Sequence, residues 1–129
     1  MKNTIILFLF LISSFSYSQP GWVTQDIPTG GRYDDIFFIN DSVGWAAGGS
    51  TQSIYHTVNG GNTWTSQFFA GKYLRSIEFA NSQLGFCGSL DSSFYKTTDG
   101  GQNWFEIANT ITPRPRGICG LSIPDSNTI

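Results

Sequence analysis

The sequence predicts an all-β fold built from a repeated unit of four short strands. Residues 54–64 and 94–104 are near copies of each other at a spacing of 40 residues. Around them, short runs rich in β-branched and aromatic residues alternate with Gly, Asn, Asp and Ser, as strands alternate with turns. After residue 18, no stretch of useful length shows the apolar period of a helix. A repeat of about 40–45 residues made of short strands has the size of one β-propeller blade.

Four strands are expected in each repeat, and they come in the same order. The first is followed by an Asn-containing turn, the second holds an aromatic residue between glycines, the third ends in Thr, and the fourth begins with Trp. Equivalent residues lie 41 apart at Ile36 and Ile77, and 40 apart at Trp64 and Trp104. The expected strands cover residues 35–39, 44–48, 53–57 and 64–68 in the first repeat and 75–79, 84–88, 93–97 and 104–107 in the second.

Partial repeats flank the two complete ones. Arg116 and Ile118 lie 41 residues beyond Arg75 and Ile77, so a third repeat begins there. Propellers close with about four to eight blades, and each blade needs neighbours to bury its faces. We therefore expect an incomplete β-propeller of four-stranded antiparallel blades over 20–129, the N-terminal part of a longer protein whose partner is the rest of its own ring. The expected units are an orphan closing strand at 22–25, blades at 32–71 and 72–112, and the start of a third blade at 113–129.

Residues 1–18 are expected to be a cleaved signal peptide rather than part of the fold. Lys2 is the only charge there, and an unbroken apolar run of eight residues extends from Ile5 to Ile12. Ser16 and Ser18 then supply small residues at the spacing that a signal peptidase reads. The alternative is a buried N-terminal helix. The run is too short for a membrane span, which needs about 20 residues, so we predict a secreted or cell-surface protein with no span.

Composition excludes some partners and leaves others open. Without Lys2 the charge is 6 − 9 = −3, with no cluster of cations, so no nucleic-acid partner is expected. No metal-ligand cluster is present, and no cofactor is expected. His56 has Lys96 as its counterpart and is interpreted as an exposed strand residue. Cys87 and Cys119 could form a disulfide, but we expect two small buried thiols.

The repeated hairpin has a physical explanation. Two residues after the Thr that ends the third strand comes Asn or Asp, whose side chain can accept hydrogen bonds from turn amides. The glycine pair then permits the positive φ angles of a tight turn, and a Trp returns to the sheet and buries a large ring. These structural residues are Thr57, Asn59, Gly60, Gly61, Thr63 and Trp64 in the first repeat and Thr97, Asp99, Gly100, Gly101 and Trp104 in the second.

This hairpin resembles the Asp-box, or BNR repeat, Ser/Thr-x-Asp-x-Gly-x-Thr-Trp, with Asn59 in place of Asp and Asn103 in place of Thr. The wider repeat looks most like the photosystem II stability/assembly factor-like group. The resemblance implies a structural role for the boxes at the blade periphery. It also implies a non-catalytic, exported scaffold that binds protein or glycan surfaces. The alternative is an exported glycoside hydrolase of sialidase or xyloglucanase type, with most catalytic residues elsewhere.

Two arginines are candidate binding residues. Arg75 and Arg116 occupy the same position in successive repeats, at the end of an expected strand, and Asp34 holds that position in the first repeat. Arginines at a channel mouth can bind carboxylates bidentately, and the resembled assembly factors use an arginine patch for partner recognition. The alternative, which we favour from the sequence, is two solvated arginines paired with Asp34 or Asp35. These neighbouring carboxylates are expected to point to opposite faces of a strand, which does not suit a glycosidase pair.

Overall fold

The computed structural model describes residues 25, 27 and 30–124. The predicted signal peptide at 1–18 lies outside them, as does the predicted strand at 22–25 apart from Gln25. Two four-stranded antiparallel sheets form the fold, and the described residues contain one short 3-10 helix, η1 (Ala108–Thr110), and no α-helix. The predicted all-β class is confirmed. Within the described part of the chain, no helix is long and apolar enough to cross a membrane.

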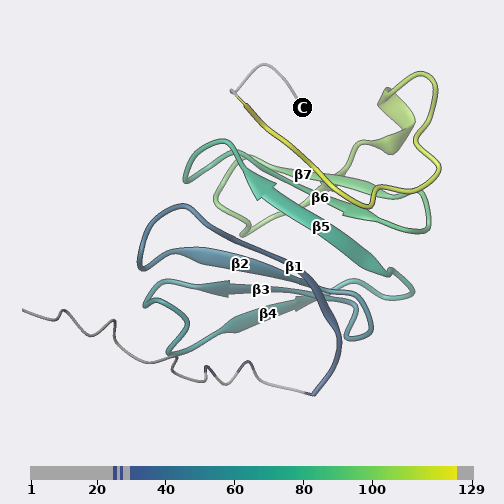
Figure 1. The fold of residues 1–129 in the computed structure, drawn as a ribbon. Helices are drawn as coiled ribbons and strands as arrows, with labels where there is room; N and C mark the ends of the chain where they lie inside the picture. Colours follow the sequence, from purple (N-terminus) through teal and green to yellow (C-terminus); the bar gives the residue numbers. More distant parts are fainter. Residues whose placement is uncertain (1–24, 26, 28–29, 125–129) are drawn as a thin grey trace, which may run out of the picture.

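Each sheet is a meander in which neighbours along the chain are neighbours in space (Figure 1). The first sheet contains β1 (Tyr33–Phe38), β2 (Gly44–Gly48), β3 (Ser53–Thr57) and β4 (Thr65–Phe68). The second contains β5 (Leu74–Phe79), β6 (Gly85–Ser89), β7 (Phe94–Thr97) and β8 (Phe105–Glu106). We call the two sheets blade 1 and blade 2.

Equivalent turns join equivalent strands. Asn40 Oδ1 accepts hydrogen bonds from the backbone N–H groups of Ser42 and Val43, each at 2.9 Å. Asn81 Oδ1 accepts from Gln83 and Leu84 at the same distances. An Asn side chain that bonds the backbone two and three residues ahead stabilises a turn, so the repeated Asn fixes where the first strand of each blade ends.

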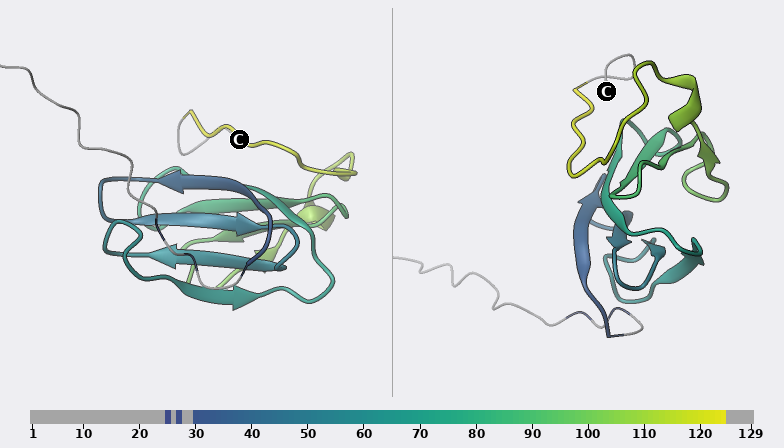
Figure 2. Two further views of the ribbon diagram at one scale, coloured as in Figure 1. Left: turned by 60° about the horizontal axis from the view of Figure 1, so that its bottom comes forward. Right: turned by 90° about the vertical axis from the view of Figure 1, so that its right-hand side faces the viewer.

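The blades stack face to face, with β5 of blade 2 lying against β1 and β2 of blade 1 (Figures 1 and 2). The centre of the contact is a ring pair, Trp45 from β2 and Phe79 from β5, whose centroids are 3.6 Å apart at an interplanar angle of 14°. Leu74, Ile77 and Cys87 are buried in the same cluster. Burial of large aromatic rings is a main source of packing free energy, so one core spans the junction of the two blades.

The first strands of the two blades have a bulge at the same place. Tyr33 pairs with Gly48 and Asp35 with Ala47, which leaves Asp34 as an extra residue. Leu74 pairs with Ser89 and Ser76 with Gly88, which leaves Arg75 extra. The prediction that Asp34 and Asp35 point to opposite faces is wrong, because a bulge interrupts the alternation of side chains. Both carboxylates contact β5.

Among the described residues, no second sheet covers the outer face of β1 in blade 1, whereas blade 1 covers the equivalent face of β5 in blade 2. Ile36 is 56 % exposed and Phe38 39 %, whereas their equivalents Ile77 and Phe79 are 1 % and 4 % exposed. Ile77 and Phe79 are covered by blade 1. The same positions therefore form a blade-to-blade contact in blade 2 and an uncovered apolar surface in blade 1.

Residues 113–124 form no strand, although the third repeat was expected to begin there. The segment nevertheless lies on blade 2: Ile118 N donates to Ser89 O at 2.9 Å, and Ile118 packs on the cluster around Phe86 and Phe94. No partner strand lies beside it within the described residues, so no ladder forms. The prediction of two buried thiols is wrong for Cys119, which is exposed in a segment that no sheet covers among the described residues. Cys87 is buried, and both thiols are free.

Candidate functional site

The two Asp-box turns have the same hydrogen-bond network. Thr57 Oγ1 donates to Asn59 Oδ1 at 3.0 Å and accepts from Gly61 N at 2.9 Å. Thr97 Oγ1 donates to Asp99 Oδ1 at 2.8 Å and accepts from Gly101 N at 2.9 Å. Both Thr side chains are buried. Because a buried amide without a partner costs about 1–3 kcal/mol, the Thr hydroxyl is as important to the turn as the acidic residue that names it.

Asn59 replaces Asp with little change in geometry. The backbone N–H of Thr63 donates to Asn59 Oδ1 at 2.9 Å, as Asn103 N donates to Asp99 Oδ1 at 2.9 Å. The second contact adapts: Asn59 Nδ2 donates to Thr63 Oγ1, whereas Asp99 Oδ2 accepts from Asn103 Nδ2. Hydrogen bonds from the Asn103 backbone and side chain lower the pKa of Asp99 from 3.8 to about 2.

The glycines and tryptophans behave largely as expected. Gly60 and Gly61 have φ of 68° and 89°, and Gly100 and Gly101 repeat these values within a few degrees at 72° and 88°. Such angles favour glycine because a Cβ would clash. Trp64 and Trp104 are half-buried rather than buried. They pack edge-on against Phe38 and Phe79 respectively, with centroids 6.1 Å and 5.9 Å apart.

The candidate Arg75 is held by an ion pair. It is the bulged second residue of β5, and its Nη1 lies 3.0 Å from Asp34 Oδ1. Arg32 Nε lies 2.8 Å from the same oxygen. The Asp34 side chain is 2 % exposed while that of Arg75 is 32 % exposed. Two cations on one buried carboxylate leave net positive charge at the surface, and part of the Arg75 guanidinium faces solvent.

Arg116 lies at the same end of blade 2 as Arg75. Ser92 Oγ donates to the Arg116 carbonyl at 2.8 Å, in the loop that follows β6. A hollow of about 530 Å³ is lined by Asp91, Ser92, Pro113, Arg114, Pro115 and Arg116. The Arg114 and Arg116 side chains are exposed. We call this end of the blades, with Arg32, Arg75, Arg114 and Arg116, the arginine end; sequence reasoning missed Arg32 and Arg114, because neither has an equivalent in the repeat.

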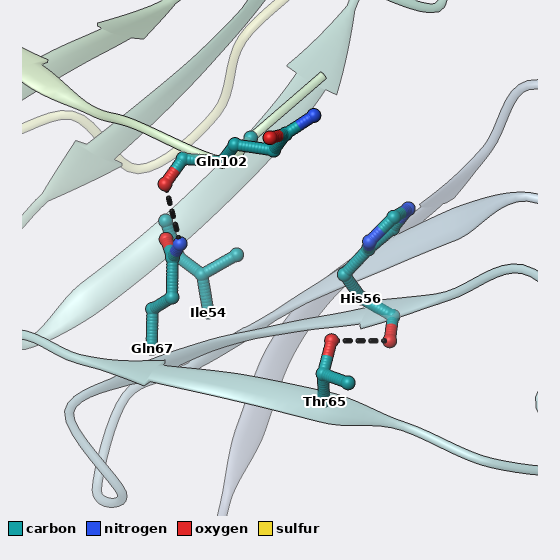
Figure 3. A pocket seen from close by; sticks show the side chains of 6 residues that line it. Ile54, His56, Thr65, Gln67 and Gln102 are labelled. Atoms are coloured by element: carbon teal, nitrogen blue, oxygen red, sulfur yellow. Dashed lines mark hydrogen bonds between the residues drawn. The ribbon is translucent and has the colours of Figure 1, made fainter. Parts of the chain in front are cut away.

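A second, smaller hollow of about 120 Å³ lies between β3 and β4 of blade 1 and the Asp-box turn of blade 2 (Figure 3). The interpretation of His56 as an exposed residue is wrong: it is half-buried and lines this hollow. Gln67 Nε2 donates to the Gln102 carbonyl at 2.8 Å, and Thr65 Oγ1 donates to the His56 carbonyl at 3.3 Å. The comparison of His56 with its counterpart Lys96 could not show that the Asp-box turn of blade 2 lies beside His56.

The described residues offer little to a catalytic or metal site. Among them, no group of three or more His, Cys, Asp and Glu side chains is placed to hold a metal ion. Asp35 Oδ1 accepts from Ile36 N and Oδ2 from Ile77 N, both at 2.9 Å. Asp34 and Asp35 are thus engaged in the inter-blade contact.

Each four-stranded sheet has an Asp-box turn between its third and fourth strands, and the two sheets stack face to face. These features define an Asp-box β-propeller. The family described as photosynthesis system II assembly factor YCF48, with BNR repeats, has a sequence model that matches residues 15–122. This chain belongs to that family, and the resemblance found in the sequence is confirmed. No curated protein matches the chain.

Eight chains of solved structures match, among them YCF48 bound to a D1 peptide. The sequence identity with that chain is 27 % and the TM-score is 0.59. The alignment covers 68 % of this chain and 29 % of the YCF48 chain. This chain therefore spans less than a third of the length of the solved propeller that it matches.

Proposed function

We propose that this chain acts as a non-catalytic propeller module that binds a protein partner at the arginine end. The observation that carries the proposal is the grouping of four arginines at one end of two stacked blades, beside a hollow of about 530 Å³. Family membership supports a scaffold of the assembly-factor kind. The solved YCF48 complex contains a peptide, which supports a peptide segment as the ligand.

The chemistry of this end favours a partner that presents carboxylates. A guanidinium group binds a carboxylate through two parallel hydrogen bonds and keeps its charge at any physiological pH. Arg114 and Arg116 border the open hollow, and the side chain of Arg75 in β5 is 32 % exposed. An acidic segment of an extended polypeptide would therefore bind here, with an affinity that falls as salt is added.

Export is a further part of the proposal, and a glycan surface is the second candidate ligand. The N-terminal sequence of charge, apolar run and small residues supports export through a cleaved signal. The exposed apolar side chains are spread over several strands, and no described cluster singles out a sugar. No observation on the described residues favours the alternative of a glycoside hydrolase. Of the two candidate functions, we therefore propose the binding module.

The test is a binding titration with acidic peptides, including the D1 peptide found with YCF48. Arg114→Ala and Arg116→Ala are expected to weaken binding about tenfold each, since a hydrogen bond to a charged group contributes about 1.5–3 kcal/mol. Arg75→Ala is combined with Asp34→Asn, so that no buried carboxylate loses one of its cations. Lys96→Ala, a cation of β7 that lies away from this end, is the matched control.

Unchanged affinity in the Arg114, Arg116 and Arg75 variants, with the fold intact by circular dichroism, would remove the arginine end as the binding site. Failure of every acidic peptide to bind the unmodified chain at low salt would remove the partner class.

A further inference from the structure

The junction between the two blades contains the only histidine of the chain. Trp45 is 1 % exposed and stacks on Phe79 of blade 2 at 3.6 Å between ring centroids. The His56 imidazole stacks on the same indole at 5.0 Å, with an interplanar angle of 13°. His56 thus belongs to the ring stack that joins β2 and β3 of blade 1 to β5 of blade 2.

Two hydrogen bonds join blade 1 to the Asp-box turn of blade 2 beside this ring stack. Trp45 Nε1 donates to the Gly100 carbonyl in the Asp-box turn of blade 2 at 3.2 Å. Gln67 donates to the carbonyl of Gln102, two residues further on (Figure 3). A change in the position of the Trp45 ring would therefore disturb the ring stack and the first of these hydrogen bonds together.

The groups around the imidazole are neutral. The hollow is lined by Ile54, Thr65, Gln67, Gly101 and Gln102 besides His56, and strands β2 and β4 contain no titratable side chain.

The charged groups on the remaining neighbouring elements are engaged elsewhere. Glu78 of β5 accepts from Ile123 N on the far side of blade 2, and Arg75 of β5 pairs with Asp34. In the adjacent turn, Asp99 is bonded to Thr97 and Asn103. Asp41 lies in the β1–β2 turn next to Gly60. Among the described residues, no carboxylate is placed to balance a positive imidazole.

We propose that the junction of blades 1 and 2 is proton-sensitive: the blades stack closely only while His56 is neutral, and its protonation loosens the contact between Trp45 and blade 2. The cause is the placement of a charge in a half-buried, neutral site. An imidazolium is also attracted to the face of the Trp45 indole. The proposal holds that the free energy of hydration lost by the charged ring is larger than this attraction.

The direction of the pKa shift of His56 agrees with the proposal. Burial lowers the pKa of His56 from its ordinary 6.5. The unfolded chain therefore takes up a proton at a higher pH than the folded chain does. The contribution of neutral His56 to stability is complete above about pH 6.5 and decreases as the pH falls from there to the folded pKa.

The second repeat provides the contrast. Lys96 stands at the position equivalent to His56, and its Nζ lies 5.8 Å from the centroid of the Phe86 ring, the equivalent of Trp45. Blade 2 carries a permanent cation there, and Phe86 lies in a cluster that is covered in part by the 113–124 segment and not by a further sheet among the described residues. His56→Lys therefore imitates the charged state, and His56→Gln imitates the neutral one.

The first test is an NMR titration of the chain from about pH 8 to about pH 5. A single histidine makes the imidazole signal unambiguous. We expect it to titrate below 6.5, and the indole N–H signal of Trp45 to shift and exchange faster with the same midpoint. A midpoint at or above 6.5, or a Trp45 signal that does not follow the titration, would overturn the proposal.

The second test compares thermal unfolding of the variants across the same pH range. The unmodified chain should lose Tm on acidification by more than His56→Gln does, and His56→Lys should already be less stable at pH 8. Equal loss of Tm in the unmodified chain and in His56→Gln would contradict the proposal. Because the NMR titration needs no substitution, it decides the matter even where a variant folds poorly.

Discussion

At the scale of single residues, one hydroxyl group organises each Asp-box turn. Thr97 is fully buried, and its Oγ1 bonds to Asp99 Oδ1, to Asp99 N and to Gly101 N. Thr57 makes the same contacts in blade 1. The Thr hydroxyl therefore holds the side chain of Asn59 or Asp99 where it accepts a hydrogen bond from a backbone N–H of the turn.

Thr97→Val is therefore expected to destabilise the chain by roughly 1–3 kcal/mol, because the part-buried Gly101 N–H loses its acceptor. Denaturant unfolding measures this cost. The matched control is Thr98→Val, since Thr98 is exposed and its equivalent in blade 1 is Val58; it should change the stability by less than about 0.5 kcal/mol. Equal costs for both substitutions would show that the hydroxyl network is unimportant.

Residue-level prediction from the sequence succeeded for local chemistry and only in part for contacts between blades. The glycine pairs have the positive φ angles expected of a tight turn, because that requirement comes from the turn alone. The expected opposite directions of Asp34 and Asp35 were wrong, since strict alternation along a strand contains no information about a bulge. The pairing of Arg75 with Asp34, which was the interpretation favoured from the sequence, is present as an ion pair at 3.0 Å.

At the scale of elements, equivalent strands have the same sequence pattern and different surroundings. Phe38 of β1 and Phe79 of β5 hold the same place in their blades, and each packs edge-on against the Trp of its own Asp box. Phe79 also stacks on Trp45 of blade 1. The free energy contributed by this position therefore depends on the neighbouring blade more than on the strand itself.

Phe79→Ala should cost about 3–5 kcal/mol, as is typical of a buried Phe, whereas Phe38→Ala should cost about 1 kcal/mol, because 39 % of Phe38 is exposed. Equilibrium unfolding in urea measures both values in the same chain. The two substitutions are chemically identical and control for each other. A cost for Phe38→Ala as large as that for Phe79→Ala would mean that blade 1 is covered on both faces.

Strand positions were predictable because each strand is bounded by its own turn chemistry. The expected 44–48 and 53–57 are the observed β2 and β3, and the other observed strands begin or end within one or two residues of the expected limits. The third repeat shows where such reasoning stops. Residues 116–118 match their equivalents in sequence, yet a strand is defined by pairing, and the described segment at 113–124 has no strand to pair with.

At the scale of the whole molecule, the two blades stack as successive members of a propeller of the YCF48 family. Stacking explains two properties that the sequence did not reveal: the half-burial of His56, and the different exposure of equivalent residues in β1 and β5. Each depends on which blade lies beside which. The repeat predicted the architecture, and the arrangement of neighbours determines the candidate sites.

The most direct test of this stacking is a set of nuclear Overhauser effects from the Trp45 ring in the isolated chain. The account predicts strong cross-peaks from Trp45 to Phe79 of blade 2, whose ring centroid is 3.6 Å away, together with cross-peaks to His56 of blade 1. Cross-peaks from Trp45 confined to residues of its own sheet, with none to Phe79, would contradict it.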